Sequence, residues 1–328
     1  MENPVNFSEE AADNIEKNHV FDVYEQISEH FSETRHSPWP NVNEFIKSFP
    51  AGSLLIDIGC GNGKYLNCSK SLFSIGSDRS NNLLKVCRSR GDHQVIIADC
   101  RVSPFRDGTA DAVICIAVLH HLATEERRLQ ALKDMSRLLS KGGRALVYVW
   151  AKEQKIGTKK STYLLQKKSE VSKREETYPS AILPVHENRT DFKHTDVLVP
   201  WKIKPKTSVC KESGTVIDPP AFLRFYHVFK EGELESLCSG VSNISVCRSY
   251  YDEEAGLSTA NSFGRFHIAS YSLMSGGLII FMHCSIRLYQ GFRVRSNSLR
   301  TNYLFQDVII TINQSRPMAK DKTQTIEN

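Results

Sequence analysis

One glycine-rich turn constrains this 328-residue chain more than any other stretch. Three glycines spaced two residues apart follow an apolar run of strand character: Gly59, Gly61 and Gly63. Residues without Cβ let a ligand approach the backbone closely at a strand end, and a following helix offers free N–H groups to it. The spacing differs from the G-x-G-x-x-G of dinucleotide sites, and Asp57 stands two residues before the first glycine. The turn predicts a nucleotide-like ligand, although tight strand-to-helix turns also use glycine for structural reasons alone.

The region around this turn alternates between strand and helix patterns. Apolar runs of strand character fall at residues 53–58, 72–77, 94–98, 111–117 and 144–150. Helical patterns precede or separate them at residues 9–31, 41–49, 81–90 and 124–139, and we expect Lys141-Gly142-Gly143 to end the last of these through a glycine C-cap. Five strands with intervening helices predict an α/β fold with a mostly parallel, doubly wound sheet and right-handed crossovers.

Polar side chains at the strand ends are candidate ligand contacts, because open parallel sheets bind ligands at their carboxyl edge. Asp78 and its neighbour Arg79 end the second strand. An acid at this place accepts hydrogen bonds from ribose hydroxyls, although Asp-x-Ser before a helix also provides an N-cap. Asp99, with Cys100 beside it, ends the third strand and is placed either to contact an adenine amino group or to cap a loop. Ala117 ends the fourth strand at the same edge.

Four further residues are candidates for substrate or cofactor contacts. His120 and His121 follow the fourth strand, and two tandem histidines at a ligand edge favour a catalytic contact about as strongly as a structural role. Adjacent side chains point in different directions, so no metal site is predicted there. Arg35 lies in a Pro-bracketed loop, where it either serves function or stacks on Trp39. Tyr24, on the inward face of the first helix, either lies over the ligand or packs in the core.

The net charge of +5 is unevenly distributed along the chain. Residues 152–214 hold 14 Lys and Arg against 8 Asp and Glu, an excess of 6 (14 − 8), and show little apolar periodicity. They predict a basic insertion that is flexible or partly ordered. No run is long and apolar enough to span a bilayer, and nine cysteines without a C-x-x-C pair predict a reduced intracellular protein without a zinc site. The expected divisions are a disordered start (1–8), a core (9–151), the insertion (152–216), the remainder of the domain (217–252) and a tail (253–328).

Several sequence blocks, taken together, resemble one family. They are His30–Pro40, Asp57–Tyr65, Ile116–His121, Glu125–Arg128, Tyr148–Gln154, Asp196–Trp201 and Phe225–Leu234. The turn alone resembles motif I of the class I S-adenosylmethionine (SAM) methyltransferases. The blocks together resemble the tRNA wobble-uridine carboxymethyl methyltransferases, some of which are fused to an AlkB-type dioxygenase. No such domain precedes the blocks here, so the chain resembles the free-standing form or an isoform of the fused one.

The resemblance implies a Rossmann-like domain that methylates 5-carboxymethyluridine at the tRNA wobble position. A carboxylate is already ionised at neutral pH, so the reaction needs positioning rather than a strong general base. Arg35 would hold the substrate carboxylate through two contacts, and His120 or His121 would orient the substrate. The expected SAM contacts are Tyr24, Asp57, Gly59, Gly61, Gly63, Asp78, Arg79, Asp99, Cys100 and Ala117.

The resemblance also implies partners and a location. Four basic residues would hold tRNA phosphates: Arg127, Arg128, Lys159 and Lys160. Family members work with a small zinc-binding activator protein that pairs with an edge strand, here Gln94 to Ala98. The implied location is the cytoplasm, with the nucleus as a second place. The alternative is a non-catalytic SAM-binding or partner-binding protein.

The chain departs from the family after Asp252. The family ends with a short strand containing Gly-Asn-Trp, which residues 253–328 lack. The segment from Arg265 to Leu273 alternates in the manner of a strand and could pair beside Ile244 to Tyr251 in its place. Both of its faces are semi-polar, whereas a strand in a helix-covered sheet is apolar on both. We therefore expect a loosely ordered tail in preference to a replacement strand.

Overall fold

The apolar runs around the glycine turn form the centre of one seven-stranded sheet. The computed structural model describes residues 7–35, 37–156, 158–165, 182–203, 221–252 and 266–272. The strand order is β10-β11-β5-β4-β1-β2-β3, and β1 to β5 pair in parallel. The strands are β1 (Leu54–Ile58), β2 (Phe73–Asp78), β3 (Gln94–Ile97), β4 (Ala110–Ile116), β5 (Leu139–Trp150), β10 (Ser245–Asp252) and β11 (Phe266–Ser272). The predicted α/β class with a mostly parallel sheet is confirmed.

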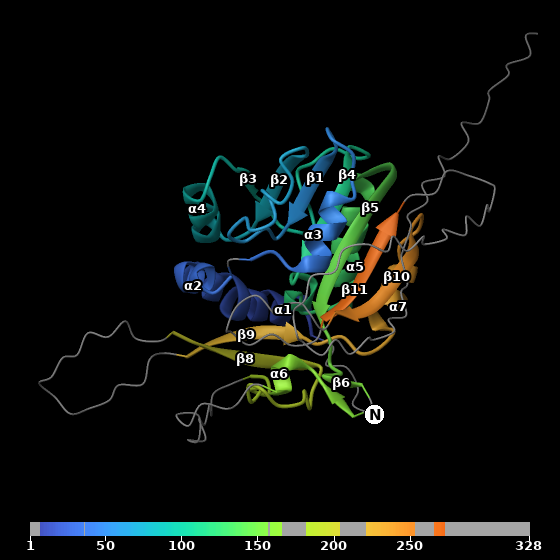
Figure 1. Ribbon diagram of the computed structural model, residues 1–328. Helices are drawn as coiled ribbons and strands as arrows, with labels where there is room; N and C mark the ends of the chain where they lie inside the picture. The colour runs from blue at the N-terminus through green and yellow to red at the C-terminus, as the bar shows by residue number, and fades with distance from the viewer. Residues whose placement is uncertain are drawn as a thin grey trace, which may run out of the picture.

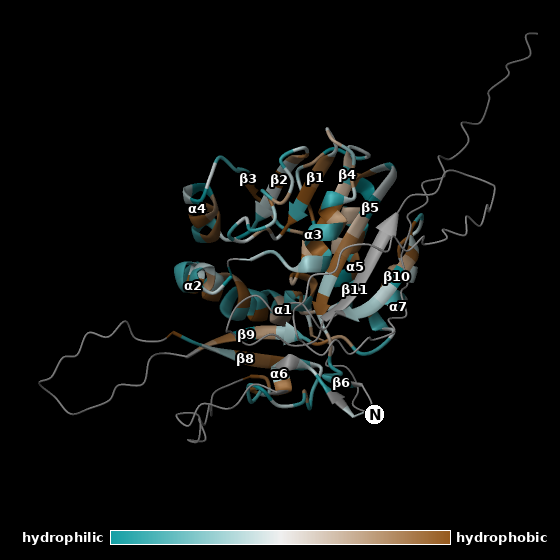
Figure 2. Ribbon diagram, in the orientation of Figure 1, coloured by the Kyte–Doolittle hydropathy of each residue, from teal (hydrophilic) through white to brown (hydrophobic). Residues whose placement is uncertain are grey.

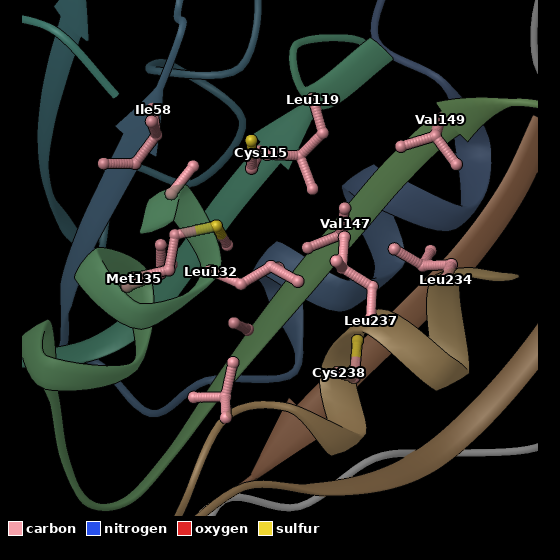
Figure 3. Packing of buried hydrophobic residues seen from close by; sticks show 14 of the residues in the cluster. Ile58, Cys115, Leu119, Leu132, Met135, Val147, Val149, Leu234, Leu237 and Cys238 are labelled. Carbon is pink, nitrogen blue, oxygen red and sulfur yellow. The ribbon is translucent and has the colours of Figure 1, made fainter. Parts of the chain in front are cut away.

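The central strands are apolar on both faces because helices cover both sides of the sheet. Figure 2 shows hydrophobic residues concentrated in β1, β4 and β5. One face packs on α5 (Glu125–Leu138) and α7 (Glu233–Ser239), where Val147 and Met135 meet in the core shown in Figure 3. The opposite face carries Tyr148, which is fully buried and lies 5.5 Å from the ring of Trp39.

The helices begin and end close to the predicted positions, but the first predicted helix is interrupted. They are α1 (Glu9–Glu16), η1 (Lys17–Phe21), α2 (Asp22–Glu33), α3 (Pro40–Lys47), α4 (Asn81–Ser89) and the short 3₁₀ turn η2 (Leu119–His121). The single helix predicted for residues 9–31 is interrupted by η1, which is a π-helical turn. π-Helical turns are frequent at functional sites, and this one directly precedes the helix that carries Tyr24.

The predicted glycine C-cap of α5 is wrong. The helix ends at Leu138, and Leu139 is already extended and opens β5. Gly142, with φ +85°, and Gly143 lie inside β5, where the pairing register with β4 shifts. A Cβ on Gly143 would lie 2.8 Å from the carbonyl oxygen of Ala110, so the backbones approach too closely for any larger residue.

A second, smaller sheet lies within and beyond the predicted basic insertion. Strands β8 (Asp196–Lys202) and β9 (Ala221–His227) form an antiparallel ribbon that lies beside α1 and α2, below the sheet in Figure 1. Short elements accompany it: β6 (Lys155–Ile156), β7 (Lys159–Lys160) and α6 (Thr162–Leu165). Because every residue of β8 except Lys202 is buried, this part of the predicted insertion is ordered and not flexible. The other domain boundaries stay predictions.

Strand β11 corrects the expectation for the tail. Residues 266–272 form a strand between β5 and β10 and pair antiparallel with both, so Ile268 lies opposite Tyr148 on one side and Tyr250 on the other. The less favoured replacement strand is therefore present, and the expected loose tail is wrong for these residues. The rest of the predicted tail lies outside the described residues. Among the described helices, none combines the length and apolar character needed to cross a membrane.

Candidate functional site

The three glycines of the turn all have positive φ, but they serve different purposes. A Cβ on Gly59 would lie 2.2 Å from Val118 Cγ2, and one on Gly63 would lie 2.4 Å from Cys87 Sγ. These two glycines therefore allow the turn to pack against the loop after β4 and against α4. Among the described residues, a Cβ on Gly61 would meet Phe31 alone, at an ordinary contact distance of 3.8 Å. Gly61 is thus the glycine of the turn that packing against its neighbours does not require, at the end of β1 where a ligand can lie.

A buried acid and a lysine flank this turn. Asp57 is 1% exposed, its Oδ2 has no hydrogen-bond partner, and burial raises the pKa of its carboxyl to about 8. Burial, followed by the charge of Arg35, lowers the pKa of the Lys64 ammonium to about 7, while Asp57 opposes the shift. The Lys64 Nζ lies 4.4 Å from the ring centroid of Trp39. An unpartnered acid oxygen beside the turn suits the ammonium of an amino-acid ligand, and the predicted contact of Asp57 with SAM stays a prediction.

The end of β2 holds the predicted ribose contact. Asp78 Oδ2 accepts a hydrogen bond from the Gly61 N–H at 2.8 Å, and Oδ1 accepts one from the Ser80 N–H at 2.8 Å. The N-cap of α4 is Ser80, whose Oγ accepts from the Leu83 N–H, so Asp78 is not needed as the cap. Burial raises the pKa of Asp78. The acid that ends β2 is thus fixed beside the ligand-facing glycine, and its ribose contact stays a prediction.

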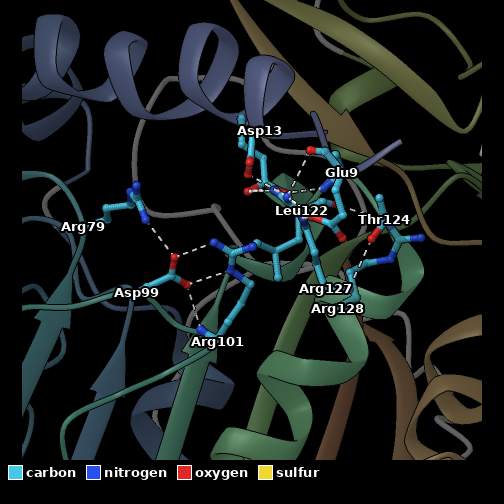
Figure 4. A network of polar contacts seen from close by, with 11 residues as sticks. Glu9, Asp13, Arg79, Asp99, Arg101, Leu122, Thr124, Arg127 and Arg128 are labelled. Atoms are coloured by element: carbon cyan, nitrogen blue, oxygen red, sulfur yellow. Dashed lines mark hydrogen bonds and ion pairs between the residues drawn. The ribbon is translucent and has the colours of Figure 1, made fainter. Parts of the chain in front are cut away.

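The end of β3 carries a compact ion-pair cluster, shown in Figure 4. Asp99 Oδ2 accepts from Arg79 at 2.7 Å and from Arg101 at 2.8 Å, and Oδ1 accepts from the Arg101 N–H. The Arg79 guanidinium also lies 3.9 Å from the ring centroid of Phe21 in the π-helical turn. Cys100 packs against the main core instead of pointing away from it. The loop-cap alternative for Asp99 is thus present, and its adenine contact stays a prediction.

The end of β4 bends sharply toward the same edge. Ala117 has φ +63°, which is uncommon for a residue with a Cβ and is found where surrounding structure enforces it. Its N–H donates to the Tyr148 carbonyl. The strand ends therefore gather the glycine turn, Asp57, Asp78, Asp99 and Ala117 at one edge. These donors and acceptors fit the amino-acid, ribose and adenine parts of SAM.

His121 is held in a hydrogen-bonded relay. Its Nδ1–H donates to the Phe225 carbonyl at 2.8 Å, so its Nε2 accepts from the Tyr24 hydroxyl at 3.0 Å. Burial lowers the pKa of His121 to about 3, so the imidazole is neutral. With both ring nitrogens used, His121 positions β9 and Tyr24. Tyr24 accordingly faces this histidine, and a direct contact with SAM stays a prediction.

His120 lies beside this relay with one nitrogen engaged. The Trp150 N–H lies 3.4 Å from its Nδ1 and donates to it, which places the ring proton on Nε2. Its ring centroid is 4.4 Å from that of His121 and 4.7 Å from that of Tyr226. Burial lowers its pKa well below the usual value. His120 is therefore a neutral hydrogen-bond donor.

Arg35 lies against aromatic rings at the end of α2. Its guanidinium carbon is 5.4 Å from the ring centroid of Phe31 and 5.5 Å from that of Trp201. The predicted stack on Trp39 stays a prediction. Asn62, directly after Gly61, donates to the Arg35 carbonyl oxygen at 3.0 Å and so ties the Arg35 loop to the glycine turn.

The sequence reasoning missed Arg224 of β9. It is 6% exposed and lies between Trp201 and Tyr226, with its guanidinium carbon 4.6 Å and 5.1 Å from their ring centroids. The charge of Arg224, after burial, helps to lower the pKa of Arg35 to about 10, so the two cations face the same space. The one available signal was Arg224 in a run of otherwise apolar and aromatic residues, Ala221–Val228.

Two of the predicted tRNA contacts are wrong. Arg127 is 4% exposed and forms ion pairs with Glu9, Asp13 and Glu16, the first two of which are shown beside it in Figure 4. Arg128 is 5% exposed and donates to the Leu122 carbonyl. Buried guanidinium groups bonded within the protein do not reach a phosphate.

The remaining tRNA and partner predictions fall on exposed elements. Lys159 and Lys160 form β7, and Lys160 is exposed. Strand β3 is the edge of the large sheet, as predicted for Gln94 to Ala98. A contact of these elements with tRNA or with another protein stays a prediction.

Comparison with known proteins places this geometry in a family. A family model described as a methyltransferase domain matches residues 56–147. The chain is 47% identical over 262 residues to the Xenopus tropicalis tRNA (carboxymethyluridine(34)-5-O)-methyltransferase alkbh8, in an alignment that covers 76% of this chain and 42% of that relative. It therefore spans less than half of that relative's length.

Two further relatives match different shares of this chain. A chain of the complex between the Haloferax volcanii Trm112 methyltransferase activator and its methyltransferase is 22% identical, with a TM-score of 0.34 over 40% of this chain and 60% of that one. The tRNA (carboxymethyluridine(34)-5-O)-methyltransferase of Schizosaccharomyces pombe is 36% identical over 248 residues, which cover 73% of this chain and 94% of that relative. The chain therefore belongs to the tRNA (carboxymethyluridine(34)-5-O)-methyltransferase family.

Proposed function

We propose that this chain uses SAM to convert the carboxylate of 5-carboxymethyluridine at the tRNA wobble position into its methyl ester. The observation that carries the proposal is the 36% identity over 94% of the Schizosaccharomyces pombe relative, which is named for this reaction. The site supports it, because strand ends suited to SAM lie beside a cluster of neutral histidines, aromatic rings and arginines. The non-catalytic alternative rested on an incomplete sheet, and β11 removes that reason.

The chemistry suits the residues of the site. SAM supplies a methyl group on a positively charged sulfonium. A carboxylate oxygen of the substrate forms the new O–CH₃ bond as the S–CH₃ bond breaks, so both charges disappear and no proton moves. Arg35 holds the carboxylate, and the Nε2–H of His120 donates to the substrate. His121 and Tyr24 keep these groups in place, and Lys160 contacts tRNA phosphates.

Nucleoside mass spectrometry of tRNA tests this function. In cells lacking the chain, 5-carboxymethyluridine should accumulate and its methyl ester should fall, and re-expression should reverse both changes. A Gly61→Arg chain serves as the inactive control for re-expression. Unchanged wobble nucleosides would contradict the proposal and favour a non-catalytic SAM-binding protein.

We also propose that a small zinc-binding activator protein covers β3. Four large apolar side chains are exposed on β2, β3 and the following loop: Phe73 (69%), Ile96 (39%), Ile97 (57%) and Val102 (71%). An uncovered edge strand with apolar side chains invites pairing with another chain, and a partner strand would bury this surface.

Replacing Ile97 with Asp should release the activator. A carboxylate at the new interface would lose its hydration, so co-purification from a co-expressing strain should fall sharply and the chain should become less soluble. Ile182→Asp is the matched control, because Ile182 is also exposed, at 65%, and lies away from β3. Equal recovery of the activator with both variants would contradict the assignment of this edge.

A further inference from the structure

Arg224 is a buried cation whose hydrogen-bonding capacity is incompletely used. It is 6% exposed, and its Nε has no hydrogen-bond partner among the residues that the structure describes. Its contacts are the faces of Trp201 and Tyr226 and the hydroxyl of Tyr24. Within the described part of the chain, no carboxylate forms an ion pair with it.

A buried guanidinium without an opposite charge lowers the stability of the folded protein unless a ligand binds beside it. Buried charges are normally paired with an opposite charge, because desolvation is not repaid otherwise. Aromatic faces and one phenol compensate a guanidinium only in part. The Arg35 guanidinium, on a different element, lies 5.5 Å from the ring centroid of the same Trp201 on which Arg224 stacks at 4.6 Å. A buried Arg224 with an unpartnered Nε beside a second cation points to an anion that arrives from outside.

The position of Arg224 relates this anion site to the methyl donor site. The residue after Arg224 accepts the hydrogen bond from His121 Nδ1, so β9 is tied to the turn after β4. That turn begins with Val118, which packs directly on Gly59 of the glycine turn. Asn62 ties Arg35 to the same turn. Both arginines are therefore connected by short, rigid links to the edge where the methyl donor would lie.

We propose that Arg224 is a specificity-determining residue that, together with Arg35, recognises the carboxylate of the modified wobble base. This inference rests on the proposed function and names the feature of the substrate that the site selects. A guanidinium offers two parallel N–H groups to a carboxylate, and the unpartnered Nε of Arg224 supplies one of them. The neutral methyl ester loses this attraction, so the same two residues favour release of the product.

The matching experiment uses the full chain and two anticodon stem-loop RNAs. One carries carboxymethyluridine at the wobble position, and the other carries the corresponding neutral carbamoylmethyluridine. The measured quantities are the Kd for each RNA, kcat/KM for methylation of the first, the Kd for SAM by calorimetry and the melting temperature. The variants are Arg224→Met and Arg224→Lys. Arg144→Met is the matched control, because Arg144 also stacks on an aromatic ring, Phe49, but belongs to β5.

The wild-type chain should bind the carboxylate RNA at least about 10-fold more tightly than the amide RNA, since a buried charge pair forms only with the former. Arg224→Met should abolish this preference and lower kcat/KM by about 100-fold. The affinity for SAM should stay unchanged, and the melting temperature should stay unchanged or rise, because a buried unpaired charge is removed. Arg224→Lys should keep part of the preference, because lysine keeps the positive charge but lacks the two parallel N–H groups of a guanidinium. Arg144→Met should behave as wild type with both RNAs.

Two other outcomes separate the inference from the proposed function. If the wild-type chain methylates the carboxylate RNA and Arg224→Met retains its preference over the amide, Arg224 has a structural role and the inference is wrong. A melting temperature that falls strongly in both Arg224 variants would also show that Arg224 has a structural role in the core, and the inference would be wrong. If the wild-type chain binds SAM but methylates neither RNA, the proposed function fails first.

Discussion

Replacing Gly61 with Arg should abolish SAM binding while leaving the fold intact. Gly61 is the glycine of the turn that leaves room beside the backbone, because the nearest described atom to the position of a Cβ belongs to Phe31, at 3.8 Å. A guanidinium and its three-carbon stem would fill that space and bring a second positive charge toward the SAM sulfonium. Calorimetry should detect no binding. SAM at 100 times its Kd should stabilise the wild-type chain by about 2.7 kcal/mol and the variant not at all.

Gly108→Arg is the control for backbone strain. Gly108 has φ +67°, close to the +54° of Gly61, and no atom lies within 4 Å of the position of its Cβ. Both substitutions therefore force an L-residue into the left-handed region, at a cost of about 1–3 kcal/mol. Only the first should remove SAM binding. Retained binding in Gly61→Arg would show that the ligand does not lie against this glycine.

The parts of the fold that sequence could predict are those set by local patterns. The five parallel strands are continuous apolar runs, and β1 stops at Gly59 because the following turn needs positive φ. The end-of-strand acids Asp57, Asp78 and Asp99 were found because parallel strands deliver their ends to one edge. Each of these depends on a few consecutive residues, so long-range contacts do not alter the prediction.

The errors arise where distant segments decide the structure. Strand β11 pairs with β5, more than 110 residues earlier in the chain, and its semi-polar pattern carries no sign of this partner. Arg224 faces the site because β9 pairs with β8 across residues 204–220, a separation that periodicity does not register. The basic composition of residues 152–214 could not tell how much of this segment is ordered, whereas in the structure the apolar side chains of β8 within it pack against α2 and the core.

The environment of Arg127 is also decided by a distant segment of the chain, which the local sequence does not reveal. Removing its charge should lower the free energy of unfolding by about 3–5 kcal/mol. From the sequence it is one of two adjacent arginines near the start of an amphipathic helix. In the structure, three acids of α1 surround it, and one of them, Glu16, is 1% exposed and lies 2.9 Å from its Nη1. Arg127→Met leaves the Glu16 carboxylate buried without its ion-pair partner, whereas Glu9 and Asp13 are exposed enough to be solvated by water. Denaturant unfolding should report this loss.

The loss in Arg127→Met should grow as the pH rises from 5 to 8. Burial raises the pKa of Glu16, and the Arg127 charge lowers it, so the substitution raises it further. Between the unfolded pKa and this higher folded pKa, the folded state binds more protons than the unfolded state, and stability therefore falls as the pH rises. Glu16→Gln should restore most of the stability to Arg127→Met and flatten this dependence, because the amide is neutral and its oxygen can still accept from the Ala123 N–H. Wild-type stability in Arg127→Met, or a loss independent of pH, would show that the Glu16–Arg127 pair does not hold α1 to α5.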